Sequence, residues 1–370
     1  MLRDLTIQNY RCFKDFHIDG LARVNLIVGM NNSGKTSLLE AIYLLVNQGN
    51  PRCLSELLDK RGEILPLRRP RLTIGGALDN NYQITHIFHG HQISSDQVIH
   101  VQSQEESFLS IEIQLCLTKE EDKLSEDIPE TEDTPETDVS PFELVFVYEP
   151  NIELTVPVLD DGSVRARSLQ RAKQSRSHLF SQTRFCQFLT TDKPPFDELS
   201  TLWNKITLTP EYDVVVRALQ ILEPNVEGFS FTSSQTSNSG VLLKRREQIH
   251  PIPLGSMGEG MRRLLALTMA TVTLKNGFLL VDEIETGLYY ETQTDMWRLI
   301  LEIAQQLNVQ VFATTHSWDC IAAFQEALDQ IEDSSIGKLF RLSRKGENIR
   351  AIDYPAEKLG VAVRQNIEVR

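Results

Sequence analysis

Residues 29–36 read Gly-Met-Asn-Asn-Ser-Gly-Lys-Thr, which matches the pattern Gly-x-x-x-x-Gly-Lys-Ser/Thr. The five residues before it, Val24–Val28, form an apolar run that is typical of a buried parallel strand. A strand, a glycine-rich loop and a helix in this order favour a phosphate-binding loop over a chance glycine turn beside a lysine. The helix is predicted by apolar residues at helical spacing, which are Leu38, Leu39, Ala41, Ile42 and Leu45.

The residue types of this loop explain how it would hold a triphosphate. Gly29 and Gly34 permit backbone angles and close approaches that a side chain would forbid. Backbone N–H groups can then point at phosphate oxygens, and the helix that begins near Lys35 adds its positive end. We expect Lys35 to reach the β- and γ-phosphates and the Thr36 hydroxyl to bind magnesium. The other residues of the loop that we assign to the nucleotide are Asn31, Asn32, Ser33 and Ser37.

Acidic residues predominate in the chain and are unevenly distributed. The 370 residues carry a formal net charge of −14, with 41% hydrophobic and 24% charged residues, which is ordinary for a folded protein of about two domains. Segment 120–138 holds ten acids and one lysine, a net charge of −9, so −5 remains for all other residues. This segment is too poor in apolar side chains to fold alone, and we predict a mobile acidic loop. The overall charge neither supports nor excludes binding to nucleic acid.

Three observations favour a cytoplasmic protein without a membrane span. Charged residues run through 2–16, so this segment does not resemble a secretory signal. The apolar stretch 264–281 is interrupted by Lys275, Asn276 and Gly277, which favours a helix followed by a strand. The five cysteines are scattered and lack metal-binding spacing, as expected in a reducing compartment.

The middle of the chain changes its pattern twice. Residues 72–158 contain runs that alternate with period two, such as 108–115 and 143–147, and these predict antiparallel strands. Residues 163–222 have helical spacing. The start of this helical region is basic, and we favour a solvent-exposed helix face over a contact with nucleic acid or an acidic partner. The basic residues are Arg165, Arg167, Arg171, Lys173 and Arg176.

A pair of acids lies where a later strand ends. The run 277–281 is apolar and is followed by Asp282 and Glu283. Ligands of open α/β sheets bind at the carboxyl edge of the strands, where these two acids would lie. We expect Asp282 to hold magnesium and Glu283 to orient or deprotonate the attacking water. The alternative is a pair of carboxylates that cap a helix.

Two further stretches have both a functional and a structural interpretation. His316 follows the strand pattern at 310–315 and is placed to hydrogen-bond a γ-phosphate, although a histidine considered alone is more often structural or exposed. Gly255–Gly260 precede a helix, so their N–H groups and Ser256 would suit a second phosphate-binding end. The alternative there is an ordinary loop with Ser256 as the helix N-cap.

Taken together, these residues resemble the ABC-type ATPase head of the group that contains SMC, RecF and OLD (overcoming lysogenization defect) proteins. The order and spacing of the segments cover nearly the whole chain, and their combination is far more specific than any one of them. The matching segments are 5–13 for the N-terminal strand and turn, 29–37 for Walker A, 255–259 for the ABC signature, 279–283 for Walker B, 285–288 for the D-loop and 313–317 for the H-loop.

The resemblance implies an α/β fold, a P-loop NTPase head of the ABC type with a mixed sheet, an antiparallel β subdomain and an inserted helical lobe. We place the N-terminal half of the head, with the β subdomain, at 1–163, the helical lobe at 164–224 and the C-terminal half at 225–370. Such an insertion explains the 247 residues that separate Lys35 from Asp282.

The resemblance also implies how nucleotide would be used. Two heads would face each other with two ATP molecules between them, and the signature of one copy would touch the γ-phosphate held by Lys35 of the other. ATP would close the dimer, and hydrolysis through Glu283, with His316 at the γ-phosphate, would reopen it. We therefore predict a homodimeric, magnesium-dependent ATP hydrolase. The signature residues assigned to the nucleotide are Ser256, Gly258 and Glu259.

Such a head would gate a separate effector protein or a nucleic-acid transaction, in phage defence or repair for example, an expectation that depends on family analogy alone. Two other functions stay open, a nucleotide-dependent scaffold with negligible turnover and the ATPase subunit of a membrane transporter. The SMC-like N-terminus argues against the transporter. Only 54 residues follow His316, too few for the Toprim nuclease domain of OLD proteins, so we expect any effector to be a separate chain.

The chain departs from the family pattern at several positions. Met257 replaces a glycine of the usual signature, and Tyr289 stands where relatives often have histidine. Gln83 and Gln92 are weak candidates for the Q-loop glutamine. Arg11, in the turn after the first strand, is a further candidate for a nucleotide contact.

Overall fold

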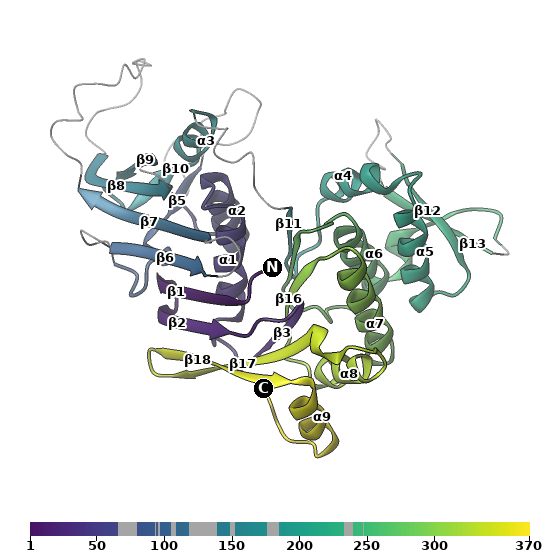
Figure 1. The fold of residues 1–370 in the computed structure, drawn as a ribbon. Coiled ribbons are helices and arrows are strands. Elements are labelled where there is room, and N and C mark those ends of the chain that lie inside the picture. Colours follow the sequence, from purple (N-terminus) through teal and green to yellow (C-terminus); the bar gives the residue numbers. More distant parts are fainter. Residues whose placement is uncertain are drawn as a thin grey trace.

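The computed structural model describes residues 1–65, 80–92, 94, 97–104, 109–117, 139–148, 152–175, 185–232, 240–246 and 248–370. Figure 1 shows these residues as two groups of elements on either side of a central sheet, with both termini near that sheet. The predicted mobile segment 120–138 and the basic residue Arg176 lie outside the described residues. In the described part of the chain, no helix has the length and apolar character needed to cross a membrane.

The central sheet is parallel except for its last strand, which pairs antiparallel with its neighbour. The carboxyl ends of its parallel strands therefore meet at one edge, where ligands of α/β proteins bind. Its strands, in order across the sheet, are β11 (Cys186–Leu189), β15 (Phe278–Val281), β16 (Gln310–Thr314), β3 (Val24–Val28), β17 (Gly337–Lys345) and β18 (Asn348–Pro355).

A second, antiparallel sheet is built almost entirely from the first 160 residues and bears out the period-two alternation of this region. The alternation leaves one face buried, as Ile99, Val101 and Ile113 illustrate with at most 1% of their surface exposed. Its strands, in order across the sheet, are β2 (Phe13–Asp19), β1 (Asp4–Tyr10), β6 (Gln97–Ser103), β7 (Leu109–Leu117), β8 (Val139–Tyr148) and β9 (Ile152–Leu159).

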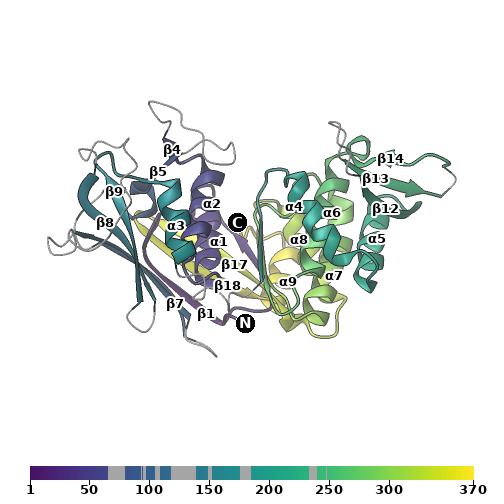
Figure 2. The same cartoon turned by 90° about the horizontal axis from the view of Figure 1, so that it is seen from above.

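Helix α1 (Lys35–Val46) packs between the antiparallel sheet and the central sheet. It begins directly after the glycine-rich loop, and most of its residues are buried because apolar surface meets it on two sides. Helices α2 (Pro51–Arg61) and α3 (Ala166–Ser175) lie on the same side of the central sheet, together with a small sheet of β10 (Ser163–Arg165), β5 (Asn81–Gln83) and β4 (Ile64–Leu65) (Figure 2).

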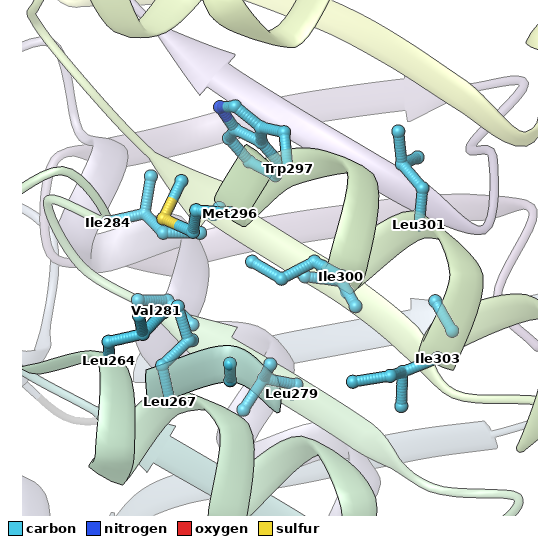
Figure 3. Close-up of a cluster of buried hydrophobic side chains, with 14 of the residues drawn as sticks. Leu264, Leu267, Leu279, Val281, Ile284, Met296, Trp297, Ile300, Leu301 and Ile303 are labelled. Carbon is cyan, nitrogen blue, oxygen red and sulfur yellow. The ribbon is translucent and has the colours of Figure 1, made fainter. Parts of the chain in front are cut away.

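The other face of the central sheet is covered by α6 (Glu259–Val272), α7 (Tyr290–Gln306) and α8 (Trp318–Asp329). Successive strand residues point to opposite faces, so Leu279 packs in this core and Leu280 in the core around α1. Both faces are apolar, which explains the continuous hydrophobic runs of β3, β15 and β16. Figure 3 shows side chains of α6, α7 and β15 directed toward one another, among them Leu267, Leu279 and Ile300.

The remaining elements form the periphery of this half. Helices α4 (Phe196–Ile206) and α5 (Pro210–Leu222) pack beside α6, next to a sheet of β12 (Val226–Thr232), β13 (Gly240–Arg245) and β14 (Ile252–Pro253). Strands β17 and β18 form a hairpin, and the sequence analysis did not predict the short helix α9 (Ala356–Arg364) that follows it.

The expectation of helix throughout 163–222 is wrong in part, because this stretch contains strands β10 and β11. Strand β11 pairs with β15 in the central sheet, and α3 packs on α2 rather than on α4 and α5. Runs of three and four residues are too short for periodicity to separate strand from helix. The boundaries 1–163, 164–224 and 225–370 remain a prediction, but the helical lobe at 164–224 is not purely helical.

Candidate functional site

A cavity of about 1050 Å³ opens at the carboxyl edge of the central sheet. Strand β3 leads into the glycine-rich loop, β15 into Asp282 and Glu283, and β16 toward His316, so three separate segments reach one place. The predicted residues that line the cavity are Arg11, Asn31, Asn32, Ser33, Gly34, Lys35, Thr36, Ser37, Asp282, Glu283 and His316.

The glycine-rich loop has the shape of an anion cradle. Gly34 caps α1 with a φ of 97°, and a Cβ there would lie 2.9 Å from the Cys12 Sγ and from the Phe13 ring. A side chain is therefore excluded at this position both by conformation and by space. The Ser33 hydroxyl is buried and has no hydrogen-bond partner within the described residues. A buried hydroxyl of this kind fits a phosphate oxygen as its missing partner.

Lys35 folds back over the loop. Its Nζ donates hydrogen bonds to the Gly29 carbonyl at 2.7 Å and the Met30 carbonyl at 3.1 Å. Partial burial lowers the pKa of Lys35 below the ordinary lysine value, while the carboxylates of Asp282 and Glu283 act in the opposite direction. An anion bound in the cradle would favour the charged ammonium in the same way as these carboxylates.

Thr36 and Asp282 are in direct contact although 246 positions separate them. The Thr36 Oγ1 donates to Asp282 Oδ2 at 2.9 Å, and the Thr314 Oγ1 donates to Asp282 Oδ1 at 2.5 Å. Hydroxyl and carboxylate oxygens are the ligands that magnesium prefers, so this pair fits the predicted metal. No group of three or more His, Cys, Asp or Glu suited to a metal occurs in the described ranges.

Glu283 has a left-handed backbone, with a φ of 47°. This conformation costs a residue with a Cβ about 1–3 kcal/mol and is often found at functional sites. The Glu283 N–H donates to Thr314 Oγ1 at 2.9 Å, which helps to hold the strained turn. The Glu283 Oε1 lies 3.7 Å from His316 Nε2, and both side chains are partly exposed toward the cavity.

Arg263, which the sequence analysis did not single out, fixes the backbone of both acids. It is 5% exposed and donates to the carbonyls of Asp282 at 2.7 Å, Glu283 at 3.2 Å and Thr190 at 2.6 Å. Burial lowers the pKa of its guanidinium. The sequence did contain a signal for this role, because Arg263 stands among the apolar residues of the helix pattern at 261–267. A buried arginine in such a place needs hydrogen-bond acceptors like these carbonyls.

Thr315 connects the D-loop to the turn at His316. The Thr315 Oγ1 donates to Glu285 Oε1 at 2.7 Å and accepts the Ser317 N–H at 3.0 Å. Thr315 and Ser317, which these bonds involve, are the residues immediately before and after His316. The Glu285 carboxylate therefore orients the turn that presents His316 to the cavity.

Arg11 lines the cavity, but its guanidinium is engaged in ion pairs. It is 5% exposed, and lies 2.7 Å from Glu40 and 2.8 Å from Glu63. Arg61 also pairs with Glu40 at 2.6 Å and donates to the Ser37 Oγ at 3.2 Å. Arg11 thus ties the turn after β1 to α1 and to the segment that follows α2, and its contact with nucleotide remains a prediction.

The signature residues lie apart from the cavity of their own chain. Ser256 and Gly258 are exposed, and Glu259 is paired with Arg262 at 3.0 Å and Lys193 at 3.3 Å. Gly258, not Ser256, is the N-cap of α6 and no side chain caps this helix, which removes the alternative of a Ser256 cap.

Sequence analysis missed much of the remaining cavity wall. Neither Gln83 nor Gln92 lies on the described wall, whereas residues from four other stretches of the chain do. One stretch is Cys12, in the family-like turn after the first strand, and the other three contain no family motif but include a dense cluster of histidines. The residues concerned are Cys12, Arg61, Glu63, His86, His89, Gly90, His91, Arg344 and Glu347.

Comparison with known proteins agrees with this geometry. A family model described as AAA ATPase domain matches residues 1–141 and 196–321. An ATP/GTP phosphatase of Helicobacter pylori is 24% identical over 372 residues, which cover 97% of each chain. RecF, a DNA replication and repair protein, of Clostridioides difficile is 32% identical over 91 residues, 24% of this chain and 23% of that protein.

Solved SMC head domains share the fold. The SMC head bound to the C-winged helix domain of ScpA aligns with a TM-score of 0.50 at 14% identity, over 96% of this chain and 99% of that chain. A Pyrococcus furiosus SMC head with an extended coiled coil, bound to the C-terminal domain of ScpA, aligns with a TM-score of 0.50 at 11% identity. The alignment covers 100% of this chain and of that chain. The predicted ABC-type α/β head and the predicted resemblance to SMC and RecF proteins are confirmed.

Proposed function

This chain belongs to the AAA ATPase domain family and is an SMC/RecF-like ATPase, and on that premise we propose a magnesium-dependent ATP hydrolase that dimerises around nucleotide. The contact between Thr36 and Asp282 is the main observation in support of this proposal. It unites the glycine-rich loop with the acids that end β15, beside Lys35 and in one cavity. A triphosphate needs this combination of N–H donors, a cation and a carboxylate.

Each group of cavity residues has its own role in the proposed hydrolysis of ATP. The loop N–H groups and Lys35 bind and orient the phosphates, which places the γ-phosphorus near Glu283. Thr36 and Asp282 would hold magnesium, which would neutralise phosphate charge. Glu283 accepts a proton from the attacking water, and its strained backbone directs the carboxylate toward the phosphate. His316 donates a hydrogen bond to the γ-phosphate from its position beside Glu283.

Dimerisation is supported by the exposure of the signature and of two large apolar side chains. Ser256 and Gly258 are exposed, and so are Met30 in the glycine-rich loop, at 76%, and Tyr289 before α7, at 61%. Apolar side chains of this size favour a protein interface when they gather on one face. A second copy would place its signature against the γ-phosphate bound by Lys35, and the two copies would separate after hydrolysis.

We propose that this cycle gates a separate protein partner or a nucleic-acid transaction in the cytoplasm. The solved SMC heads are bound to ScpA domains, which is the support for a protein partner. The likeness to RecF is the support for a role in DNA repair. The proposal of phage defence depends on the resemblance to the group that contains OLD proteins.

Replacement of Glu283 by glutamine tests the proposal. The amide cannot accept the proton, so we expect phosphate release to fall by at least about a hundredfold. We also expect ATP-bound dimers to persist in size-exclusion chromatography. Glu302→Gln, at an exposed position of α7, is the control and should behave as the unmodified protein.

Two outcomes would contradict the proposal. Equal and slow phosphate release by the unmodified protein and Glu283→Gln would mean a scaffold that binds ATP without turnover. Lys35→Ala should abolish nucleotide binding, with Lys275→Ala at an exposed position as its control. Unchanged ATP affinity of Lys35→Ala would reject the site itself.

A further inference from the structure

Three of the eight histidines of the chain lie within six residues and line the cavity that holds the glycine-rich loop. They are His86, in the short helix η1 (Thr85–Ile87), and His89 and His91, in the turn that follows it. This cluster takes no part in the roles proposed above. Apart from His316, which lies beside Glu283, only these side chains are aromatic among the described residues that line the cavity.

The path of a bound nucleotide leads toward this wall. Lys35, the Thr36–Asp282 pair and Glu283 define the γ-phosphate end, so the α-phosphate lies toward Ser37 at the start of α1. Ser37 is connected through Arg61 and Glu40 to Arg11. The Arg11 carbonyl in turn contacts His89, which places the histidine turn on the side from which the nucleoside must leave the loop.

The histidine turn is held firmly by the end of β1 and the turn that follows it. The Arg11 N–H donates to the Ile87 carbonyl at 2.8 Å, and the His89 N–H donates to the Asn9 carbonyl at 3.2 Å. Phe88 is fully buried and forms a bridge with Tyr10. The wall is therefore preorganised, which lowers the entropy cost of binding a flat ligand against it.

The side chains suit a heteroaromatic base. His89 Nδ1 lies 3.0 Å from the Arg11 carbonyl, an acceptor, so Nδ1 carries the hydrogen and Nε2 of the neutral ring is an acceptor. The rings of His86 and His91 meet edge to face with centroids 5.3 Å apart, and both side chains are exposed. Exposed rings offer faces on which a base can stack, and the acceptor suits its exocyclic amine.

We propose that residues 86–91 form a base-binding wall that takes the purine of a nucleoside triphosphate. The base stacks on one of the two perpendicular rings of His86 and His91 and meets the edge of the other, and His89 Nε2 accepts a hydrogen bond from its amine. This inference extends the proposed function, because the phosphates of the same ligand occupy the glycine-rich loop.

Comparison of ATP with inorganic tripolyphosphate tests the wall separately from the loop, since tripolyphosphate has no base. We expect the double variant His86→Ala/His91→Ala to lose about tenfold in ATP affinity by calorimetry and nothing in tripolyphosphate affinity. His86→Phe/His91→Phe keeps two aromatic rings and should retain ATP affinity. Lys35→Ala should lose both ligands, and His250→Ala, at an exposed position off the cavity wall, should lose neither.

The outcomes distinguish this inference from the proposed function. If the alanine pair binds both ligands as the unmodified protein does, or loses both equally, the base-binding wall is wrong and the phosphate site stands. If the unmodified protein binds neither ligand, the proposed function fails, and the wall with it. Thermal unfolding of each variant checks that the turn remains folded.

A second comparison tests the role of His89. His89→Asn keeps an N–H donor for the Arg11 carbonyl but removes the acceptor nitrogen. The unmodified protein should bind ATP about tenfold more tightly than purine riboside triphosphate, which lacks the amine, and His89→Asn should bind the two alike. A preference that survives in His89→Asn, or that is absent from the unmodified protein, overturns the assignment.

Discussion

The two ends of the cavity are built in opposite ways. At the phosphate end, side chains from distant segments bond directly, as Thr36 and Thr314 do on the two oxygens of Asp282. At the histidine end, side chains come from one short turn held mainly by backbone bonds, and their rings face solvent. Reacting groups must be held to fractions of an ångström, whereas a stacking surface tolerates small displacements. We therefore expect substitutions at the phosphate end to have much larger effects.

The largest effect is expected at Asp282. Asp282→Asn removes the charge that suits magnesium and leaves one of two threonine hydroxyls facing an amide group that cannot accept its hydrogen bond. Loss of a single residue that only supports the metal ligands lowers metal affinity or activity about 10- to 100-fold. Loss of this carboxylate should therefore lower turnover by at least about a hundredfold. Steady-state phosphate release measures it, with Asp213→Asn at an exposed position as the control. Turnover within a factor of three of normal would remove Asp282 from the site.

Arg263 should matter mainly for stability. Arg263→Met leaves the carbonyls of Thr190, Asp282 and Glu283 without their donor, and buried unsatisfied groups cost about 1–3 kcal/mol each. We expect the free energy of unfolding in urea to fall by about 3 kcal/mol, because part of the cost is relieved by relaxation. Arg262→Met, one residue away and on a partly exposed ion pair, should cost less than about 1 kcal/mol. Equal losses in the two variants would contradict the anchoring role of Arg263.

Thr315 tests whether the D-loop positions His316. Thr315→Val keeps the shape but removes the hydroxyl that bonds Glu285 and the Ser317 N–H. We expect kcat to fall about tenfold with KM unchanged, since one such bond is worth about 1 kcal/mol. Thr315→Ser restores the hydroxyl and should restore kcat. A rise in KM with kcat unchanged would indicate a binding role instead.

The smallest effect is expected at Glu347, an exposed residue of the cavity wall. Glu347 lines the cavity and lies 3.7 Å from Lys14, with both side chains more than 60% exposed. Exposed ion pairs contribute about 0–1 kcal/mol, so Glu347→Gln should change ATP affinity less than about twofold. A loss comparable with that of His86→Ala/His91→Ala would mean that Glu347 binds the nucleoside directly.

The local sequence was sufficient to predict the segments that lead to the cavity. Strand β3, the glycine-rich loop and α1 follow one another without a gap, and β15 ends where the acids begin, so periodicity and glycine chemistry predicted them. Strand β11 escaped prediction because four residues show no period, and its identity as a strand depends on pairing with β15. The role of Arg263 escaped for a related reason, since its partners are carbonyls of residues that lie near it only after folding.

By itself, the sequence determined the elements and the kinds of chemistry they bring, because turn geometry, strand alternation and the residue types of a phosphate loop are local properties. Only the tertiary structure decided which groups meet. The central sheet sets β3, β16 and β15 side by side, so their carboxyl ends bring Thr36 onto Asp282 across 246 positions. The end of β1 and the turn after it likewise hold the histidine turn at the same cavity. Such contacts depend on strand order, which no short stretch of the chain encodes.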